Sequence, residues 1–334
     1  MADVERAFFR VEGLSGPQWA SWSGMTFDLA RGDILLLRGE SGSGKTTLLK
    51  ALADLLPSDG GSIVLQGRPH ASLPPHIYRS RVLYVPQRPS ILPGSPRDFL
   101  DMVYDFSANR DLGPLPEVED LSERDTEAAV TADGASLNAH GWKIEEAEIP
   151  LESTSTADDA SSIRSGSSAR NNSRDRPTVD TRSLRRAASK SFSRAPTIPN
   201  DPIFLSSAEW GLPTSVWDRE WSQISGGEAQ RVGLAVPLCL IGGKRKGDGV
   251  LLLDEPTSAL DSRTAAAVEK TLLLSRTALT LIWITHSEDQ ARRIITLVDE
   301  DNHRRRGSPA KYDDDLPRER KVFVLSLSAS SLQN

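Results

Sequence analysis

Four apolar residues in a row, Ile34 to Leu37, predict a strand that is buried on both of its faces. A glycine-rich loop follows. From Lys45 to Leu56 leucines then recur at spacings of three and four residues, which is the period of an amphipathic helix. Pro57 stops that helix, because proline cannot continue it. The pattern therefore predicts a strand, a flexible loop and a helix in direct succession.

Two further patterns set the fold class. Short or alternating apolar segments predict an antiparallel layer, and they lie at residues 7–14, 25–29 and 62–67. After residue 202, helical and buried-strand patterns alternate, with helices expected at 225–240 and 262–276, and strands at 249–256, 278–286 and 321–327. Strands that alternate with helices form a parallel, doubly wound sheet. The prediction is an α/β fold with a parallel core sheet and an antiparallel β layer.

The middle of the chain differs from both ends. Apolar periodicity fades over residues 107–200, where Ser, Arg, Asp, Glu and Thr dominate. Such a segment cannot bury enough apolar surface to offset the entropy of ordering it. We therefore expect one domain, residues 1–106 and 201–334, with a disordered insertion at 107–200. Its first half is mainly acidic and its second mainly basic, which leaves open a plain spacer, contact with anionic lipid, or regulation by phosphorylation.

Charge and composition bear on the binding partners and the cellular compartment of the protein. The net charge of -6 gives no support for nucleic-acid binding, which usually leaves a basic footprint. The lone cysteine, Cys239, fits a reducing compartment. No secretory signal is visible, and no run approaches the roughly 18 apolar residues that cross a bilayer. If the protein acts at a membrane, we expect it to lie peripherally on the cytoplasmic side while another chain supplies the span.

The glycine-rich loop has the chemistry of a phosphate site. Its glycines allow backbone angles that turn successive N–H groups toward an anion, and the helix amino terminus adds positive potential there. Lys45 can reach the outer phosphates, and the Thr46 hydroxyl can ligate Mg²⁺. The match to G-x-x-x-x-G-K-[ST] is complete, and it predicts an ATP site built by Gly39, Glu40, Ser41, Gly42, Ser43, Gly44, Lys45, Thr46 and Thr47.

A second motif supplies carboxylates. The apolar strand pattern at 249–256 ends in Asp254, which can hold Mg²⁺ opposite Thr46. Glu255 follows directly, where a carboxylate can polarise a water that attacks the outer phosphate. Joined to the phosphate loop, the pair predicts hydrolysis.

A third motif narrows the class. Ser225, Gly226 and Gly227 precede a helix and form a second anion site in the chain. One nucleotide does not need two cradles, but two copies arranged head to tail would use both. Here the sequence resembles the ATP-binding cassette (ABC) ATPases, and "ISGGEAQR" matches their signature except for Ile224 in place of the usual leucine. The resemblance covers residues 6–106 and 202 to about 300.

The resemblance implies further roles. Gln87 matches the glutamine that approaches Mg²⁺ and links the nucleotide site to a membrane partner, so Thr46, Gln87 and Asp254 become the metal residues. His286 matches the switch histidine near the outer phosphate, and Asp261 the residue that communicates across a dimer. The family also has an aromatic residue that stacks on adenine upstream of the phosphate loop. Trp19 is the candidate here, and Trp22 is the alternative unless it belongs to the core. Pro237 departs from the pattern, and we expect it to kink or end the signature helix.

Flanking stretches at 74–100, 211–231 and 280–297 look like the ATPase subunits of bacterial Fet-type iron exporters and plant aluminium-tolerance half-transporters. The leading hypothesis is therefore an ATP-hydrolysing subunit that works as a homodimer on a separate transmembrane permease, in metal-related export. The alternative is a soluble single-cassette ATPase that serves as an assembly factor, for example in iron–sulfur cluster assembly. A small-molecule kinase does not explain "ISGGEAQR".

Overall fold

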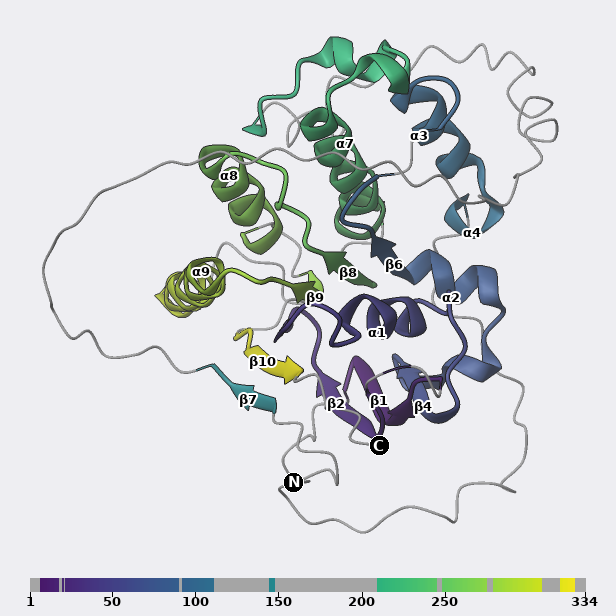
Figure 1. Cartoon of the computed structure of the whole chain (residues 1–334), viewed down its shortest axis with the longest axis vertical. Helices are drawn as coiled ribbons and strands as arrows, with labels where there is room; N and C mark the ends of the chain where they lie inside the picture. The colour runs from purple at the N-terminus through teal and green to yellow at the C-terminus, as the bar shows by residue number, and fades with distance from the viewer. Residues whose placement is uncertain are drawn as a thin grey trace, which may run out of the picture. The chain divides into compact units, whose positions relative to one another are not determined.

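The computed structural model describes residues 7–17, 20, 22–89, 92–110, 144–147, 209–244, 248–274, 279–307 and 319–327. Contacts divide the chain into two units, Met1–Ala147 with Ile198–Asn334, and Glu148–Thr197. Every described residue belongs to the first unit, and Figure 1 labels most of its helices and strands.

The core of the unit is a six-stranded sheet in the order β6-β8-β9-β3-β10-β7. Its first five strands run parallel, and only β7 is antiparallel to its neighbour. Their bounds are Val82–Val85 (β6), Val250–Asp254 (β8), Thr280–Ile284 (β9), Ile34–Gly39 (β3), Val322–Leu327 (β10) and Ile144–Glu146 (β7). The predicted parallel sheet and its closing strand are therefore confirmed.

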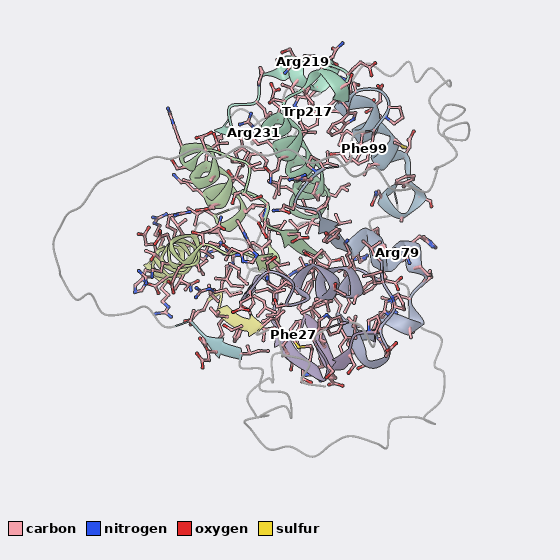
Figure 2. The ribbon with its side chains drawn as sticks, viewed as in Figure 1. Phe27, Arg79, Phe99, Trp217, Arg219 and Arg231 are labelled. Carbon is pink, nitrogen blue, oxygen red and sulfur yellow. The ribbon has the colours of Figure 1, made fainter. Side chains whose placement is uncertain are left out.

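A second, four-stranded sheet is antiparallel and has the order β2-β1-β4-β5. Its strands are Met25–Leu29 (β2), Phe9–Ser15 (β1), Gly60–Leu65 (β4) and Arg68–Pro69 (β5). The antiparallel layer that the sequence predicts is present, with β5 as an additional edge strand. Figure 2 shows Phe27 among its side chains.

The parallel sheet separates two apolar clusters because its strands alternate. Leu35 and Leu37 of β3 face the cluster that contains the antiparallel sheet and helix α1, Lys45–Leu52. Ile34 and Leu36 face the other cluster, which contains α8, Ser262–Leu273, and α9, Glu288–Gly307. Helices thus cover both faces of the sheet, as the doubly wound prediction requires.

The remaining helices form a smaller region beyond β6. Trp217 and Trp221 are buried there against α3 and α7, and Figure 2 labels Trp217 and Phe99 in this part of the molecule. The elements of the region are α3 (Pro96–Asp105), α4 (Ser107–Arg110), η2 (Thr214–Asp218), η3 (Trp221–Gln223) and α7 (Gly226–Leu238), while η1 (His70–Ser72) and α2 (Pro75–Arg81) lead into β6.

Pro237 acts as expected on the signature helix. Helix α7 ends one residue after it, and the chain continues as a π-helical turn, Cys239–Lys244. Proline lacks the N–H that would bond the carbonyl four residues earlier, so the regular helix cannot be maintained through this point.

Helix α1 corrects one prediction. It ends at Leu52 instead of Leu56, because Asp54 takes a left-handed backbone conformation with φ of 57° and the N–H groups of Leu55 and Leu56 turn back to the carbonyl of Lys50. Leu55, expected on the apolar face, is 51% exposed. The backbone therefore ends the helix before Pro57.

The structure covers only a small part of the predicted insertion. Most of residues 107–200 lie outside the described residues, but α4 and β7 fall inside that range. Strand β7 is held by backbone pairing with β10, by Lys321, which donates to Glu146 at 3.1 Å, and by Ile144, which packs against the apolar cluster around the antiparallel sheet. At least this part of the range thus has regular structure, and it joins the edge of the core sheet.

Candidate active site

The site lies at one edge of the parallel sheet, where three adjacent strands end. Strands β8, β9 and β3 lie side by side and run in the same direction, so their carboxyl ends meet. Figure 1 labels β8 and β9. The phosphate loop follows β3, Asp254 ends β8, and His286 comes two residues after β9. Sequence segments more than 200 residues apart are thereby brought together, as the register Asp254↔Ile284 and Leu37↔Ile284 records.

The loop backbone requires glycine at the start. Gly39 has φ of 144°, and a Cβ atom on it would lie 2.0 Å from the carbonyl oxygen of Leu327 on β10. Gly42 has φ of 83° with open space around it, and Gly44 has φ of 87° where it caps α1. The loop therefore approaches β10 as closely as a backbone can, while its middle faces solvent.

The Lys45 side chain bonds the backbone of this loop. Its ammonium group donates to the carbonyl oxygens of Gly39 at 2.9 Å and Glu40 at 2.6 Å, and it lies 3.2 Å from the Ser43 hydroxyl. Burial lowers the pKa of Lys45, although the charges of Glu255 and Asp254 act in the opposite direction. Among the described residues no carboxylate lies within ion-pair distance of it, so its charge suits an anionic ligand such as phosphate.

Asp254 is held by two hydroxyl groups. Thr46 donates to one carboxylate oxygen at 3.2 Å, and Tyr84 of β6 donates to the other at 2.8 Å. Burial, together with the hydrogen bond to Asp254, raises the pKa of Tyr84, so that its proton stays on the phenol. The carboxylate is thereby fixed in orientation beside the exposed Thr46.

The donors around Asp254 fit Mg²⁺. A threonine hydroxyl, a carboxylate and the Gln87 amide are hard oxygen ligands, and Mg²⁺ in nucleotide sites is held by one or two such groups together with phosphates. Over the ranges that the structure describes, no group of three or more His, Cys, Asp and Glu residues could hold a metal by itself. Thr46, Gln87 and Asp254 would supply at most part of the shell of such an ion, and phosphate and water oxygens would supply the rest.

Glu255 lies between two polar side chains from other elements. Its carboxylate accepts from Gln87 Nε2 at 2.8 Å, and its other oxygen lies 3.0 Å from His286 Nε2. Its backbone has φ of 46°, a conformation that residues other than glycine seldom adopt, and Gln230 Nε2 lies 3.5 Å from its carbonyl oxygen. This unusual backbone turns the Glu255 side chain away from the strand direction and toward Gln87 and His286.

The signature residues cap a helix. Ser225 and Glu228 form a reciprocal capping box at the start of α7, and Arg219 donates to Glu228 at 2.6 Å. The Ser225 N–H bond and Arg219 lower the pKa of Glu228 to about 2. Ser225 and Gly226 are exposed, and a Cβ atom added to Gly227 would lie 3.9 Å from the Ala259 carbonyl oxygen and from the Leu260 side chain. This end of α7 is therefore rigid and open to solvent.

Asp261 has the same capping role on α8. Its carboxylate accepts from the N–H groups of Arg263 and Thr264 and from the Thr264 hydroxyl, which lowers its pKa. In the described part of the chain, no hydrogen bond or ion pair links Asp261 or Ser225 to the phosphate loop. The structure thus brings Lys45, Thr46, Gln87, Asp254, Glu255 and His286 together. Gln230 of the signature reaches the backbone of Gln87 and Glu255, whereas Ser225 and Asp261 make no hydrogen bond or ion pair to this group within the described residues.

The expected aromatic residue is not found in the described site. Trp19 lies outside the described residues. Trp22 is 2% exposed within the cluster around the antiparallel sheet, which agrees with a role in the core and leaves no ring face for a base.

Sequence reasoning missed Tyr84 and Gln230. Only alternation along β6 pointed to Tyr84, because it places this residue on the face opposite Leu83 and Val85.

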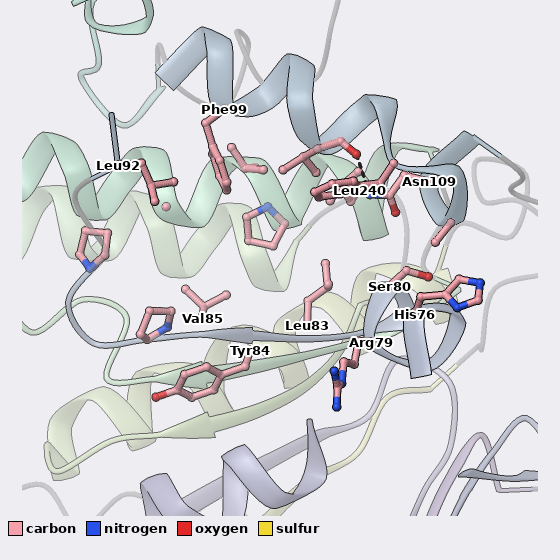
Figure 3. A pocket seen from close by; sticks show the side chains of 18 of the residues that line it. His76, Arg79, Ser80, Leu83, Tyr84, Val85, Leu92, Phe99, Asn109 and Leu240 are labelled. Carbon is pink, nitrogen blue, oxygen red and sulfur yellow. Dashed lines mark hydrogen bonds between the residues drawn. The ribbon is translucent and has the colours of Figure 1, made fainter. Parts of the chain in front are cut away.

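An apolar groove lies next to the site. Its volume is about 730 Å³, and it lies between β6, α3, α4 and α7. Figure 3 shows Leu83 and Val85 projecting from β6 toward α3 and α7, with Tyr84 on the other side of the strand. Other walls are made by Phe99 and Trp221, whose rings meet edge to face at 6.2 Å, and by Pro237. The loop that carries Gln87 forms part of the rim.

Comparison with known proteins decides the family. Residues 22–258 match the family model described as ABC transporter. The chain belongs to the ABC transporter family. It is also 25% identical over 279 residues to the probable iron export ATP-binding protein FetA of Escherichia coli (strain K12), covering 82% of each chain.

Solved structures show the same cassette fold. The ATP-binding subunit of an ABC transporter superposes with a TM-score of 0.51 and 17% identity, covering 86% of this chain and 83% of that one. A bacterial ABC transporter cassette solved as a dimer gives 0.50 and 15% identity, covering 85% and 90%. The chain is accordingly an ATP-binding subunit of the ABC type, with the ATPase activity that defines this family.

Proposed function

We propose that this chain powers a separate membrane permease that exports metal ions. The family assignment supports the transport ATPase, and the similarity to a probable iron export ATP-binding protein supports the metal. Within the part of the chain that the structure describes, no helix combines the length and apolar character needed to cross a bilayer. The proposal therefore places the chain peripherally, on the cytoplasmic side, against a partner that forms the pore.

The arrangement around Glu255 is the observation that carries the proposed chemistry. Glu255 accepts the proton of an attacking water, with Gln87 and His286 orienting its carboxylate, since both contact it within 3.0 Å. Lys45 and the loop N–H groups bind the β and γ phosphates. Thr46, Asp254 and Gln87 would hold Mg²⁺, which when bound neutralises charge that develops on the phosphate oxygens.

A homodimer completes each site in this proposal. Ser225 and Gly226 present exposed groups at the amino terminus of α7 but contact no part of the phosphate loop in their own chain, over the described ranges. A second copy arranged head to tail would place them on the γ phosphate, where a helix amino terminus stabilises an anion. Asp261, exposed at the start of α8, would then face the dimer partner.

The apolar groove is the surface proposed for the permease. Its walls carry little charge, and Phe106 on its edge is 54% exposed. A groove of this kind accepts the apolar face of a short helix. The loop of Gln87 borders the groove and also reaches Glu255, so an occupant of the groove would be coupled to the catalytic carboxylate.

The alternative, a soluble assembly factor, shares the nucleotide chemistry. The groove and the transport ATPases among the relatives favour the transporter instead.

The purified Glu255→Gln variant tests the site. It should bind ATP with unchanged affinity, hydrolyse it at least about a hundredfold more slowly, and accumulate as a dimer in light scattering, because the isosteric amide cannot accept the water's proton. Glu300→Gln, the same substitution at an exposed position of α9, is a matched control that should leave turnover unchanged. Full hydrolysis by Glu255→Gln would refute the assigned role.

A further inference from the structure

Gln290, on the first turn of α9, is buried and bonds three different elements. Its Nε2 group donates to the Thr257 hydroxyl at 2.7 Å and to Glu269 Oε1 at 2.7 Å, and its Oε1 atom accepts from the Thr285 hydroxyl at 2.6 Å. Gln290 is 8% exposed, and the other three are buried as well. Three of the four hydrogen-bonding positions of the amide are therefore filled, which fixes which way it points.

The partners of Gln290 flank the two groups that face each other in the active site. Thr285 directly precedes His286, and Thr257 follows Glu255 by two residues. The Thr285 hydroxyl also accepts the N–H of Ser287, and the Ser287 hydroxyl accepts the N–H of Gln290, so the turn that carries His286 is closed from both sides. One amide thus ties the segment after β8 to the segment after β9.

Glu269 anchors the amide from α8. Its side chain is fully buried, and Arg293 of α9 donates to both of its oxygens at 2.9 and 3.1 Å. A buried carboxylate is tolerated only when it is paired and hydrogen-bonded, and here the guanidinium and the Gln290 amide satisfy it together. Loss of the amide would leave Glu269 with one partner fewer, and would leave the Thr257 and Thr285 hydroxyls without the group that joins them.

We propose that Gln290 is a positioning residue for ATP hydrolysis, which acts by holding Thr257 and Thr285 at a fixed separation and thereby sets the 3.0 Å contact between Glu255 and His286. This inference rests on the catalytic roles proposed above. Small displacements of a catalytic group slow the chemical step far more than they weaken binding, because orientation contributes mainly to the transition state. Within the described residues, the hydrogen bonds of Gln290 reach none of the groups proposed to bind the nucleotide, so its effect should fall on turnover.

Gln290→Leu is the first test. The variant should lower turnover about tenfold or more while ATP affinity, measured by fluorescence titration, stays within about twofold. The control is Thr296→Val, which removes a side-chain hydrogen bond from an exposed position of the same helix. Equal turnover in Gln290→Leu and Thr296→Val would overturn the proposal.

Gln290→Glu separates positioning from a loss of folding. It keeps the shape of the side chain but places a carboxyl next to Glu269, and two such groups cannot both ionise cheaply, so the pKa of one rises. When protonated, the new carboxyl can donate to Glu269 as the amide does. Relative to wild type, the turnover of Gln290→Glu should therefore rise as the pH falls from about 8 to 6. A ratio that does not change with pH would contradict the proposal.

A double variant that exchanges the Gln290 amide and the Glu269 carboxylate should restore part of the turnover. Glu269→Gln combined with Gln290→Glu restores one amide and one carboxylate with their roles reversed, so turnover should recover part of what Gln290→Glu loses. If Glu255→Gln abolishes hydrolysis but the Gln290 variants behave as wild type, only the positioning role fails. If Glu255→Gln hydrolyses ATP normally, the proposed active site fails as well.

Discussion

Gly39→Ala should destabilise the chain strongly. The backbone of Gly39 has φ of 144°, a region almost reserved for glycine, and the added methyl would lie 2.0 Å from the Leu327 carbonyl oxygen. That oxygen belongs to the pairing of β10 with β3, so it cannot move aside as a flexible side chain could. Backbone strain costs about 1–3 kcal/mol and overpacking about as much again.

The sum is about 4 kcal/mol, near the middle of those ranges. For large domains each kcal/mol shifts the midpoint of thermal unfolding by roughly 2–4 °C, so the midpoint should fall by about 10 °C. The assay is thermal unfolding of the full chain without nucleotide, followed by circular dichroism, so that lost ATP binding does not enter the result.

Gly13→Ala is the matched control. Gly13 also has positive φ, 59°, but nothing lies within 4 Å of the added atom. Gly13→Ala should lower the free energy of unfolding by the backbone strain alone, about 1 kcal/mol, which lowers the thermal midpoint by roughly 3 °C. Equal losses in the two variants would show that the methyl meets no obstacle at Gly39, and would refute the close approach of the loop to β10.

Three more predictions follow from single contacts. Lys45→Ala should weaken ATP binding at least tenfold, because the phosphates lose their main cation; unchanged binding in a fluorescence titration would exclude Lys45 from the site. Tyr84→Phe removes the hydroxyl that orients Asp254 and should raise the Mg²⁺ concentration for half-maximal ATP binding about tenfold; an unchanged Mg²⁺ dependence would show that the bond does not matter. The pKa of Glu228 is lowered to about 2, so its contribution to stability is present above pH 4.5 and lost as the pH falls from 4.5 to about 2. Glu228→Gln should make unfolding less sensitive to pH in that interval, and identical profiles would contradict this.

Long periodic segments allowed most of the core to be predicted. The strand predicted at Ile34–Leu37 lies within β3, the strand predicted at Met25–Leu29 coincides with β2, and the parallel sheet, the antiparallel layer and the closing strand are confirmed. Boundaries set by single backbone angles were less predictable. The left-handed Asp54 shortens α1, although the leucine spacing continues through Leu55 and Leu56.

Strand β7 was missed because its pairing carries no sequence pattern. It has three residues, Ile144–Glu146, and joins β10 through backbone hydrogen bonds that any side chains allow. The polar composition of residues 107–200 predicted disorder there. Strand β10 provides the backbone hydrogen-bonding partners that stabilise β7, and the local sequence of β7 does not reveal these partners.

The sequence identified the motif residues of the site, but it did not identify the residues that hold them in position. Spacing and glycine content pointed to Lys45 and Asp254. Tyr84 lies 170 residues from Asp254, and Gln290 joins three segments that only the fold brings together. No local pattern distinguishes such a tyrosine or glutamine from an ordinary polar residue, so only the hydrogen bonds in the structure reveal them.

The central claim, an ATPase subunit that drives a separate permease, is tested most directly by affinity purification of Glu255→Gln from detergent-solubilised membranes in the presence of ATP. One integral membrane protein should be recovered in near-equal amount by Glu255→Gln, and it should be lost when Phe106→Asp, at the exposed edge of the groove, is added. Recovery of only soluble proteins, or a membrane protein retained equally by the Phe106 variant, would contradict the account of how this chain meets its partner.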